Sequence, residues 1–242
     1  MHSFTYFLSC SLSKKRIESG RFKVITVFYW RKDTMKNNYK MPIVRMDDEE
    51  EEPVAAEEKE KGTEVNEMVE QKLLENRQIF LWGAVDDDTA KDLVSKLLYL
   101  EATKPGEEIT FFVNSPGGII SSGMAIIDTM HLISSPVKTV CMGLAASMGS
   151  LILSAGAKGK RYIFPNGKVM IHQPSVDYLY GQASDLEIQA RQILRTRESV
   201  AAMLAKNCGK SKDRILKDLD RDYWMDSDES IEYGIVDAVY KF

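Results

Sequence analysis

A serine set among small residues is the first part of this sequence whose residue types and spacing suit chemistry. Residues 143–149 read Gly-Leu-Ala-Ala-Ser-Met-Gly, with the serine at 147, and an apolar run follows at 151–153. Small residues let the backbone turn sharply and approach a substrate closely. The pattern is typical of a strand end, a tight turn and a helix start, which would present the Ser147 hydroxyl as a nucleophile beside N–H groups that face an oxyanion. Taken alone, such a serine is more often a tight packing position.

A histidine and an aspartate that follow the serine complete a possible acyl-transfer triad. His172 ends the short apolar segment 168–172, and Asp222 closes the run Asp220-Arg221-Asp222. In such a triad the histidine takes the serine proton and the aspartate orients the histidine. The chain order Ser, His, Asp differs from the orders found in three well-known hydrolase folds, so a triad here would belong to another scaffold. Individually, a strand-end histidine is usually structural and an aspartate in a charged run usually lies on the surface.

A pair of glycines offers backbone N–H groups for the same chemistry. Residues 114–118 read Asn-Ser-Pro-Gly-Gly and lie between a predicted strand at 108–114 and a predicted helix at 122–133. Bare N–H groups at a helix start suit a phosphate or an oxyanion hole. The stretch is not a phosphate-binding P-loop, because no Gly-Lys-Ser/Thr follows, and it does not have the dinucleotide-binding pattern. By itself it could also be an ordinary turn.

Strands alternating with helices are the elements that must position these residues. The apolar periods predict strands at 77–82, 108–114, 137–142, 161–164 and 168–172, and a final strand at 235–240. They predict helices from about 65, at 89–103, 122–133, 148–155 and 183–207, with short helices at 211–222 and 230–233. This alternation predicts an α/β layered fold with a mostly parallel sheet.

The first 64 residues are predicted to be an extension, and residues 65–242 to be the folded domain. Residues 1–34 hold seven Lys and Arg against two acids. They could be a targeting peptide, a disordered tail, or the product of an upstream start codon, with Met35, Met41 or Met46 as the true start. Residues 47–61 are strongly acidic, which predicts a solvated lead-in; a docking tail for a partner is the alternative.

The net charge, the cysteine spacing and the length of the apolar runs exclude several classes of protein. The net charge is −4, and residues 1–34 carry +5, so the remaining residues carry −9 and offer no basic surface for nucleic acid. The cysteines at 10, 141 and 208 are too far apart in sequence for a disulfide framework or a zinc site, which indicates a reducing compartment and no metal. No apolar run approaches the roughly 20 residues that a membrane span needs.

Together the motifs resemble one family, the ClpP peptidases, which form the proteolytic chamber of the ATP-dependent Clp protease (peptidase family S14). The matching stretches are residues 114–118, 143–149, 155–161, 170–174, 181–185, 220–222 and 232–237. The resemblance implies a ClpP/crotonase fold with a protruding helix–strand handle. It implies a barrel of two stacked heptameric rings, homomeric or mixed, with the active sites inside. Unfolded proteins would be fed in by a Clp-family AAA+ unfoldase that hydrolyses the ATP, so this chain would need no cofactor.

The resemblance also assigns roles to individual residues. It implies a serine endopeptidase in which Ser147 is the nucleophile, His172 the general base and Asp222 the residue that orients the imidazole. The oxyanion donors would be the N–H groups of Gly118 and Met148.

Other positions correspond to assembly surfaces of the family. Asp220 and Arg221 match the ring-to-ring pair, and the helix at 183–207 matches the handle that interlocks the rings. Apolar clefts for loops of the ATPase would be built by three residues that could otherwise be simple core: Phe112, Leu132 and Tyr162. The resemblance implies a cytoplasmic protein of protein quality control, or an imported organellar one if residues 1–34 are a transit peptide.

Two stretches depart from the family pattern, and two other functions stay open. The acidic segment before Gln71 lacks the stretch that lines the axial pore, and residues 175–180 carry bulky side chains where relatives have glycines. Such divergence is common where several subunit types form mixed rings. The chain could therefore be an inactive or partner-dependent structural subunit of a mixed ring. An acyl-CoA enzyme is the remaining alternative, because the crotonase fold is shared with such enzymes.

Overall fold

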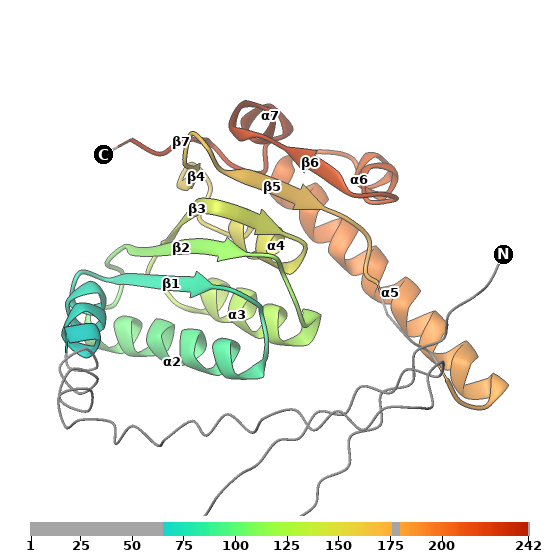
Figure 1. Cartoon of the computed structure of the whole chain (residues 1–242), viewed down its shortest axis with the longest axis horizontal. Coiled ribbons are helices and arrows are strands. Elements are labelled where there is room, and N and C mark those ends of the chain that lie inside the picture. Colours follow the sequence, from blue (N-terminus) through green and yellow to red (C-terminus); the bar gives the residue numbers. More distant parts are fainter. Residues whose placement is uncertain (1–64, 176–179, 242) are drawn as a thin grey trace, which may run out of the picture. The chain divides into compact units, whose positions relative to one another are not determined.

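A seven-stranded sheet is the layer on which the chain is built (Figure 1). The computed structural model describes residues 65–175 and 180–241. In chain order the strands are β1 (Gln78–Trp82), β2 (Ile109–Ser115), β3 (Val137–Ala146), β4 (Arg161–Ile163), β5 (Lys168–Ile171), β6 (Tyr223–Met225) and β7 (Ala238–Val239). Their order is β1-β2-β3-β4-β7, with β5 paired to the end of β3 and β6 paired to β5. Only the β5–β6 pair of named strands is antiparallel in this part of the chain, so the predicted α/β fold with a mostly parallel sheet is confirmed.

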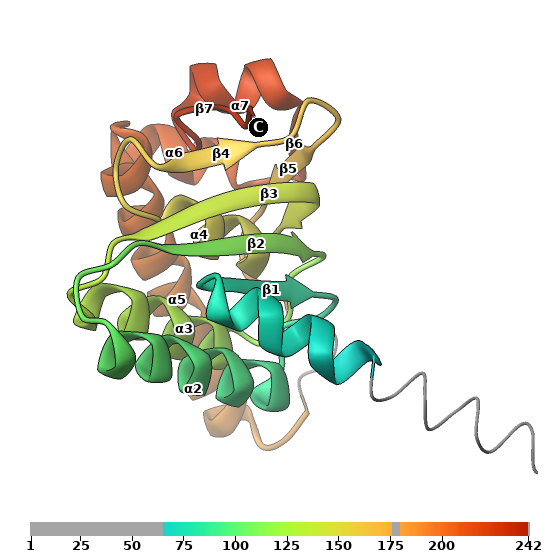
Figure 2. The ribbon, with the colours of Figure 1, turned by 90° about the vertical axis from the view of Figure 1, so that its left-hand side faces the viewer.

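Helices pack on this sheet and close its core. They are α2 (Asp87–Thr103), α3 (Ile120–Leu132), α4 (Met148–Ser154), α5 (Ala183–Cys208), α6 (Lys212–Asp218) and α7 (Ser227–Tyr233). Residues 65–75 are helical as well. Figure 2 shows α2 and α3 side by side along the sheet. The predictions for residues 1–64 lie outside the described residues. Residues 176–179, in the stretch where bulky side chains replace the glycines of relatives, lie outside them as well.

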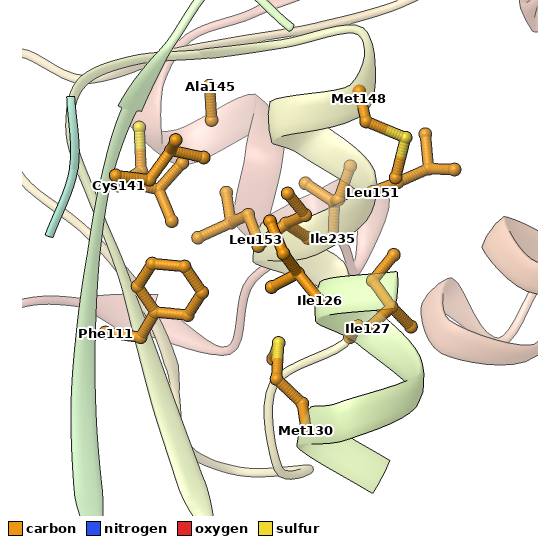
Figure 3. Close-up of a cluster of buried hydrophobic side chains, with 14 of the residues drawn as sticks. Phe111, Ile126, Ile127, Met130, Cys141, Ala145, Met148, Leu151, Leu153 and Ile235 are labelled. Atoms are coloured by element: carbon orange, nitrogen blue, oxygen red, sulfur yellow. The ribbon is translucent and has the colours of Figure 1, made fainter. Parts of the chain in front are cut away.

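The core fills the space between the sheet and these helices. Phe111 of β2 points from the sheet toward Ile126 and Met130 of α3 and Leu153 of α4, and Cys141 of β3 belongs to the same buried cluster (Figure 3). All five side chains are buried. Burying one large apolar side chain contributes about 1.5–3 kcal/mol, so this layer holds β2 and β3, with their ends, against α3 and α4. The site described below is built at those ends.

Hydrogen bonds explain two of the boundaries that differ from the sequence prediction. Helix α2 begins before residue 89, since the Asp86 carboxylate accepts a bond from the Thr89 N–H at 2.8 Å and the Thr89 hydroxyl accepts one from the Asp86 N–H at 2.9 Å. This reciprocal cap satisfies N–H groups that a helix start leaves without partners. Strand β3 continues to Ala146 instead of residue 142, because its last residues pair with β5.

The largest difference between the predicted and the observed elements lies in residues 211–240. A helix was predicted over residues 211–222, but α6 ends at Asp218 and the chain then forms the short strand β6. Strand β7 is also shorter than the predicted 235–240. These short strands have no sustained period of their own, and they exist because they pair with β5 and β4.

Helix α5 matches its predicted bounds and has two different halves. Its second half is packed, with Val200, Ala201 and Leu204 buried. Its first half extends past the sheet (Figure 1), and Ile188 and Leu194 are exposed there. Gly209 ends the helix in the left-handed conformation at φ 66°, which glycine adopts without steric cost.

Glu101 of α2 fastens the segment that leads into β3. Its carboxylate accepts bonds from the Ser134 hydroxyl and from the N–H groups of Ser134 and Ser135. These bonds lower the pKa of Glu101 from 4.5 to about 2. Because the folded pKa lies below the unfolded one, the carboxylate stabilises the fold above about pH 4.5, and this contribution is lost as the pH falls toward 2.

We therefore expect Glu101→Gln to reduce the loss of stability on acidification between pH 4.5 and 2. Thermal unfolding midpoints across this range measure the effect. The variant should be less stable than the wild type at pH 7 and converge with it at low pH. Glu67→Gln, which removes an exposed carboxylate from residues 65–75, is the control. Parallel curves for Glu101→Gln and the wild type would contradict the assignment.

Candidate active site

Ser147 occupies the turn between β3 and α4 in a strained backbone conformation. Its φ is 52° and its ψ −120°, which a residue with a side chain rarely adopts, and such strain costs about 1–3 kcal/mol. Backbone bonds hold it: the Ser147 N–H donates to Met170 O at 2.9 Å, and its carbonyl accepts from Ser150 and Leu151. The half-buried Ser147 side chain is thereby held at the end of β3, as the sequence predicts.

Parallel pairing of β3 with β5 brings the histidine to the serine. Ala146 is the register partner of Met170, so the two strands end at the same edge of the sheet. Ser147 directly follows β3 and His172 directly follows β5. His172 Nε2 lies 2.9 Å from Ser147 Oγ, which is hydrogen-bonding distance for proton transfer.

Antiparallel pairing of β5 with β6 brings the aspartate to the histidine. Ile171 pairs with Tyr223, so the same register continued by one residue places His172 opposite Asp222. His172 Nδ1 lies 3.2 Å from Asp222 Oδ1. The Asp222 side chain is 61% exposed and that of His172 26%. The three predicted triad residues, far apart in sequence, are thus brought together in the predicted chain of contacts.

The glycine turn lies against the serine and has no room for side chains. A Cβ on Gly117 would come within 2.6 Å of Ser147 Cβ, and one on Gly118 within 2.2 Å of Val85 O. Their φ angles are +99° and +150°. Val85 N–H donates to Gly117 O at 2.9 Å, and Ile119 N–H donates to Val85 O at 2.7 Å. Both glycines are therefore required by packing and by backbone conformation.

Two N–H groups, of Gly118 and Met148, remain without an acceptor in the glycine turn and at the start of α4. The pairing of Val85 with this turn uses Gly117 O and Ile119 N–H, and within the described residues the Gly118 N–H has no acceptor. Met148 is the first residue of α4, where an N–H has no acceptor within the helix. These are the two predicted oxyanion donors, and neither N–H has an acceptor among residues 65–175 and 180–241.

An amide that sequence reasoning passed over shapes the end of β3. The β2–β3 register slips between Val113 and Ser115, so β3 bulges there. Asn114 Oδ1 accepts a bond from the Leu144 N–H at 3.3 Å inside the bulge, next to Gly143 at φ +91°. A bulge re-aims the strand that carries it, here the strand that leads into Ser147. The motif at 114–118 contained this asparagine, but its bond partner lies in another segment.

The comparison with protein families agrees with this geometry. A family model described as Clp protease matches residues 60–242, which include every residue of the site. The chain belongs to the Clp protease family. The family resemblance is therefore confirmed at this level, and so are the ClpP/crotonase-like fold and the general class of peptidase.

Other predicted residues of this Clp protease chain lie outside the site. Asp220 and Arg221 are exposed in the segment between α6 and β6, and in the described part of the chain no ion pair joins them. Their ring-to-ring role stays a prediction. Across residues 65–175 and 180–241, no group of three His, Cys, Asp or Glu could hold a metal ion. No helix within those ranges is both long and apolar enough to span a membrane.

The three residues predicted to form ATPase clefts do not share one face of this Clp protease chain. Phe112 stacks on Phe80 at 4.8 Å, and Tyr162 meets Tyr240 at 5.7 Å. Tyr240 also contacts Phe112, so these rings form one aromatic row across the sheet. Leu132 ends α3 on the helix layer and is 79% exposed. The role of these three residues in clefts for an ATPase stays a prediction.

Proposed function

We propose that this chain is the proteolytic subunit of an ATP-dependent Clp protease and cleaves peptide bonds as a serine endopeptidase. The observation that carries the proposal is the continuous contact from Asp222 through His172 to Ser147, at 3.2 and 2.9 Å. A hydroxyl is a weak nucleophile until an adjacent base takes its proton, and this is the arrangement that activates it.

The reaction follows from this geometry. Ser147 Oγ attacks the carbonyl carbon of the peptide bond while His172 Nε2 takes the hydroxyl proton. The negative oxygen of the tetrahedral intermediate accepts bonds from the N–H groups of Gly118 and Met148. The C–N bond then breaks as His172 returns the proton to the leaving amine. Water, deprotonated by His172, hydrolyses the acyl-enzyme to release the new carboxyl end and restore Ser147.

The substrate we propose is an extended, unfolded polypeptide. It would pair like an added strand with the segment after Gly118 and with the segment after Pro174. Unfolded substrate would be supplied by a Clp-family AAA+ ATPase, which hydrolyses the ATP, to a barrel of two heptameric rings. The exposed apolar side chains on the first half of α5 support a second chain packing there.

Labelling by a fluorophosphonate probe tests this proposal. Purified wild-type protein, separated by size, should be labelled in the barrel-sized fraction and lose the label in His172→Ala. A barrel-sized wild type that does not label would contradict the proposal and favour the structural subunit of a mixed ring. Hydrolysis of acyl-CoA thioesters without hydrolysis of acyl-peptides would favour the acyl-CoA enzyme.

The oxyanion role predicts a large effect of one added methyl group. Gly118→Ala should lower kcat about 10²- to 10³-fold, because the methyl group would clash with Val85 O and move the N–H that stabilises the intermediate. Steady-state hydrolysis of a peptide reporter measures this. Gly159→Ala is the matched control, since Gly159 also has a positive φ but no atom lies within 4 Å of its added Cβ. Equal losses of kcat in Gly118→Ala and Gly159→Ala would mean that backbone strain, and not a displaced oxyanion donor, causes the loss.

A further inference from the structure

Asp222 is the least sheltered member of the proposed triad. Its carboxylate is 61% exposed, and within the described residues its side chain has one hydrogen bond, the 3.2 Å contact to His172 Nδ1. An exposed and solvent-screened contact of this kind does little to fix a side chain. The position of Asp222 must therefore come from the backbone on either side of it.

The two sides of Asp222 are held in different ways. On the C-terminal side, β6 pairs with β5 from Tyr223 onward. On the N-terminal side, residues 219–222 form a turn between α6 and β6 and belong to no strand. Gln173 spans this turn with two bonds: its N–H donates to Leu219 O at 2.8 Å, and its side-chain Nε2 donates to Asp220 O at 3.2 Å.

We propose that Gln173 is a positioning residue for the triad. Its side-chain amide holds the main chain of Asp220 and so keeps Asp222 opposite His172. Gln173 directly follows His172, so one short stretch of backbone carries the imidazole and also fastens the segment that carries its carboxylate partner. The inference rests on the proposed function, in which Asp222 orients His172.

Two substitutions test the amide without removing the main-chain bond to Leu219. Gln173→Glu has nearly the same shape, but a carboxylate cannot donate a hydrogen bond and would face the Asp220 carbonyl oxygen. Gln173→Met removes the bond without adding charge. Gln71→Glu makes the same change of charge at an exposed position of residues 65–75 and is the control.

We expect kcat for a peptide reporter to fall about 10- to 100-fold in both Gln173 variants, with KM unchanged. A displacement of about 1 Å of a catalytic group costs up to about 10²-fold, whereas the surfaces that would bind substrate are not altered. In an Asp222→Ala background, Gln173→Glu should lower kcat no further. Such non-additivity is expected only if Gln173 acts through Asp222.

Three results would overturn the inference. The first is a loss of kcat in Gln173→Glu that multiplies with the loss caused by Asp222→Ala. The second is a rise in KM at constant kcat. The third is that neither Gln173 variant forms the wild-type assembly.

A crystal structure of Gln173→Glu gives a readout that does not need activity. The distance from His172 Nδ1 to Asp222 Oδ1 should lengthen from 3.2 Å in this variant. An unchanged distance would contradict the proposal. If the wild type itself neither hydrolyses peptides nor takes the fluorophosphonate label, the proposed function fails, while this distance still decides whether Gln173 positions Asp222.

Discussion

Ser147→Ala should reduce peptide hydrolysis to background, a fall in kcat of about 10⁶-fold. Removing the nucleophile of a serine triad has an effect of this size, and what remains comes from substrate binding and the oxyanion donors. Because the Ser147 side chain contacts His172 Nε2 and the strained backbone is held by main-chain bonds, we expect a folded variant with a thermal midpoint close to that of the wild type. Initial rates with a fluorogenic peptide measure the loss.

A matched control separates this effect from the general loss of a hydroxyl. Ser95 is exposed on α2, and its hydroxyl donates to Lys91 O within the same helix. Ser95→Ala should retain wild-type kcat and KM and wild-type fluorophosphonate labelling. If pure Ser147→Ala protein kept the wild-type rate, Ser147 would not be the nucleophile, and the contacts in the site would have to be explained as structure alone.

The sequence predicted well those parts of the fold whose signal is local. Helix α5 was expected over residues 183–207 and runs Ala183–Cys208, because its apolar period is long and Gly209 ends it. Strand β2 was expected from its continuous apolar centre, and the structure buries that centre. Each prediction used information carried by neighbours in the chain, which periodicity and capping residues report directly.

Elements fixed by contacts between distant segments were missed. The residues of β6 read Tyr-Trp-Met, too short for a period, and the strand forms because β5 lies beside it. Asp222 directly precedes this strand, and the pairing with β5 places it opposite His172. Periodicity alone could therefore not bring the two together, and only the family motifs indicated them. The amides of Asn114 and Gln173 were missed for the same reason, since each bonds a carbonyl or N–H in a segment far along the chain.

Asp222→Ala should be severely damaging, with kcat falling about 10³- to 10⁴-fold and KM little changed. Without the carboxylate, nothing in the triad holds the imidazole in the tautomer that presents a free Nε2 to Ser147, and the imidazolium formed during attack loses its counter-ion. A loss of this size is smaller than that expected for Ser147→Ala, because a mispositioned base still works part of the time.

Because Asp222 is exposed, this prediction distinguishes a directed hydrogen bond from a mere charge near the site. If the aspartate acted only as a charge near the site, solvent screening would limit its contribution, and Asp228→Ala, another exposed aspartate of the same region, would have a comparable effect. Steady-state kinetics of both variants at one ionic strength distinguish the two cases. A large loss confined to Asp222→Ala requires the directed bond to His172 Nδ1. Similar small losses in both variants would mean that His172 is oriented by something else, and that the contact at 3.2 Å is incidental to catalysis.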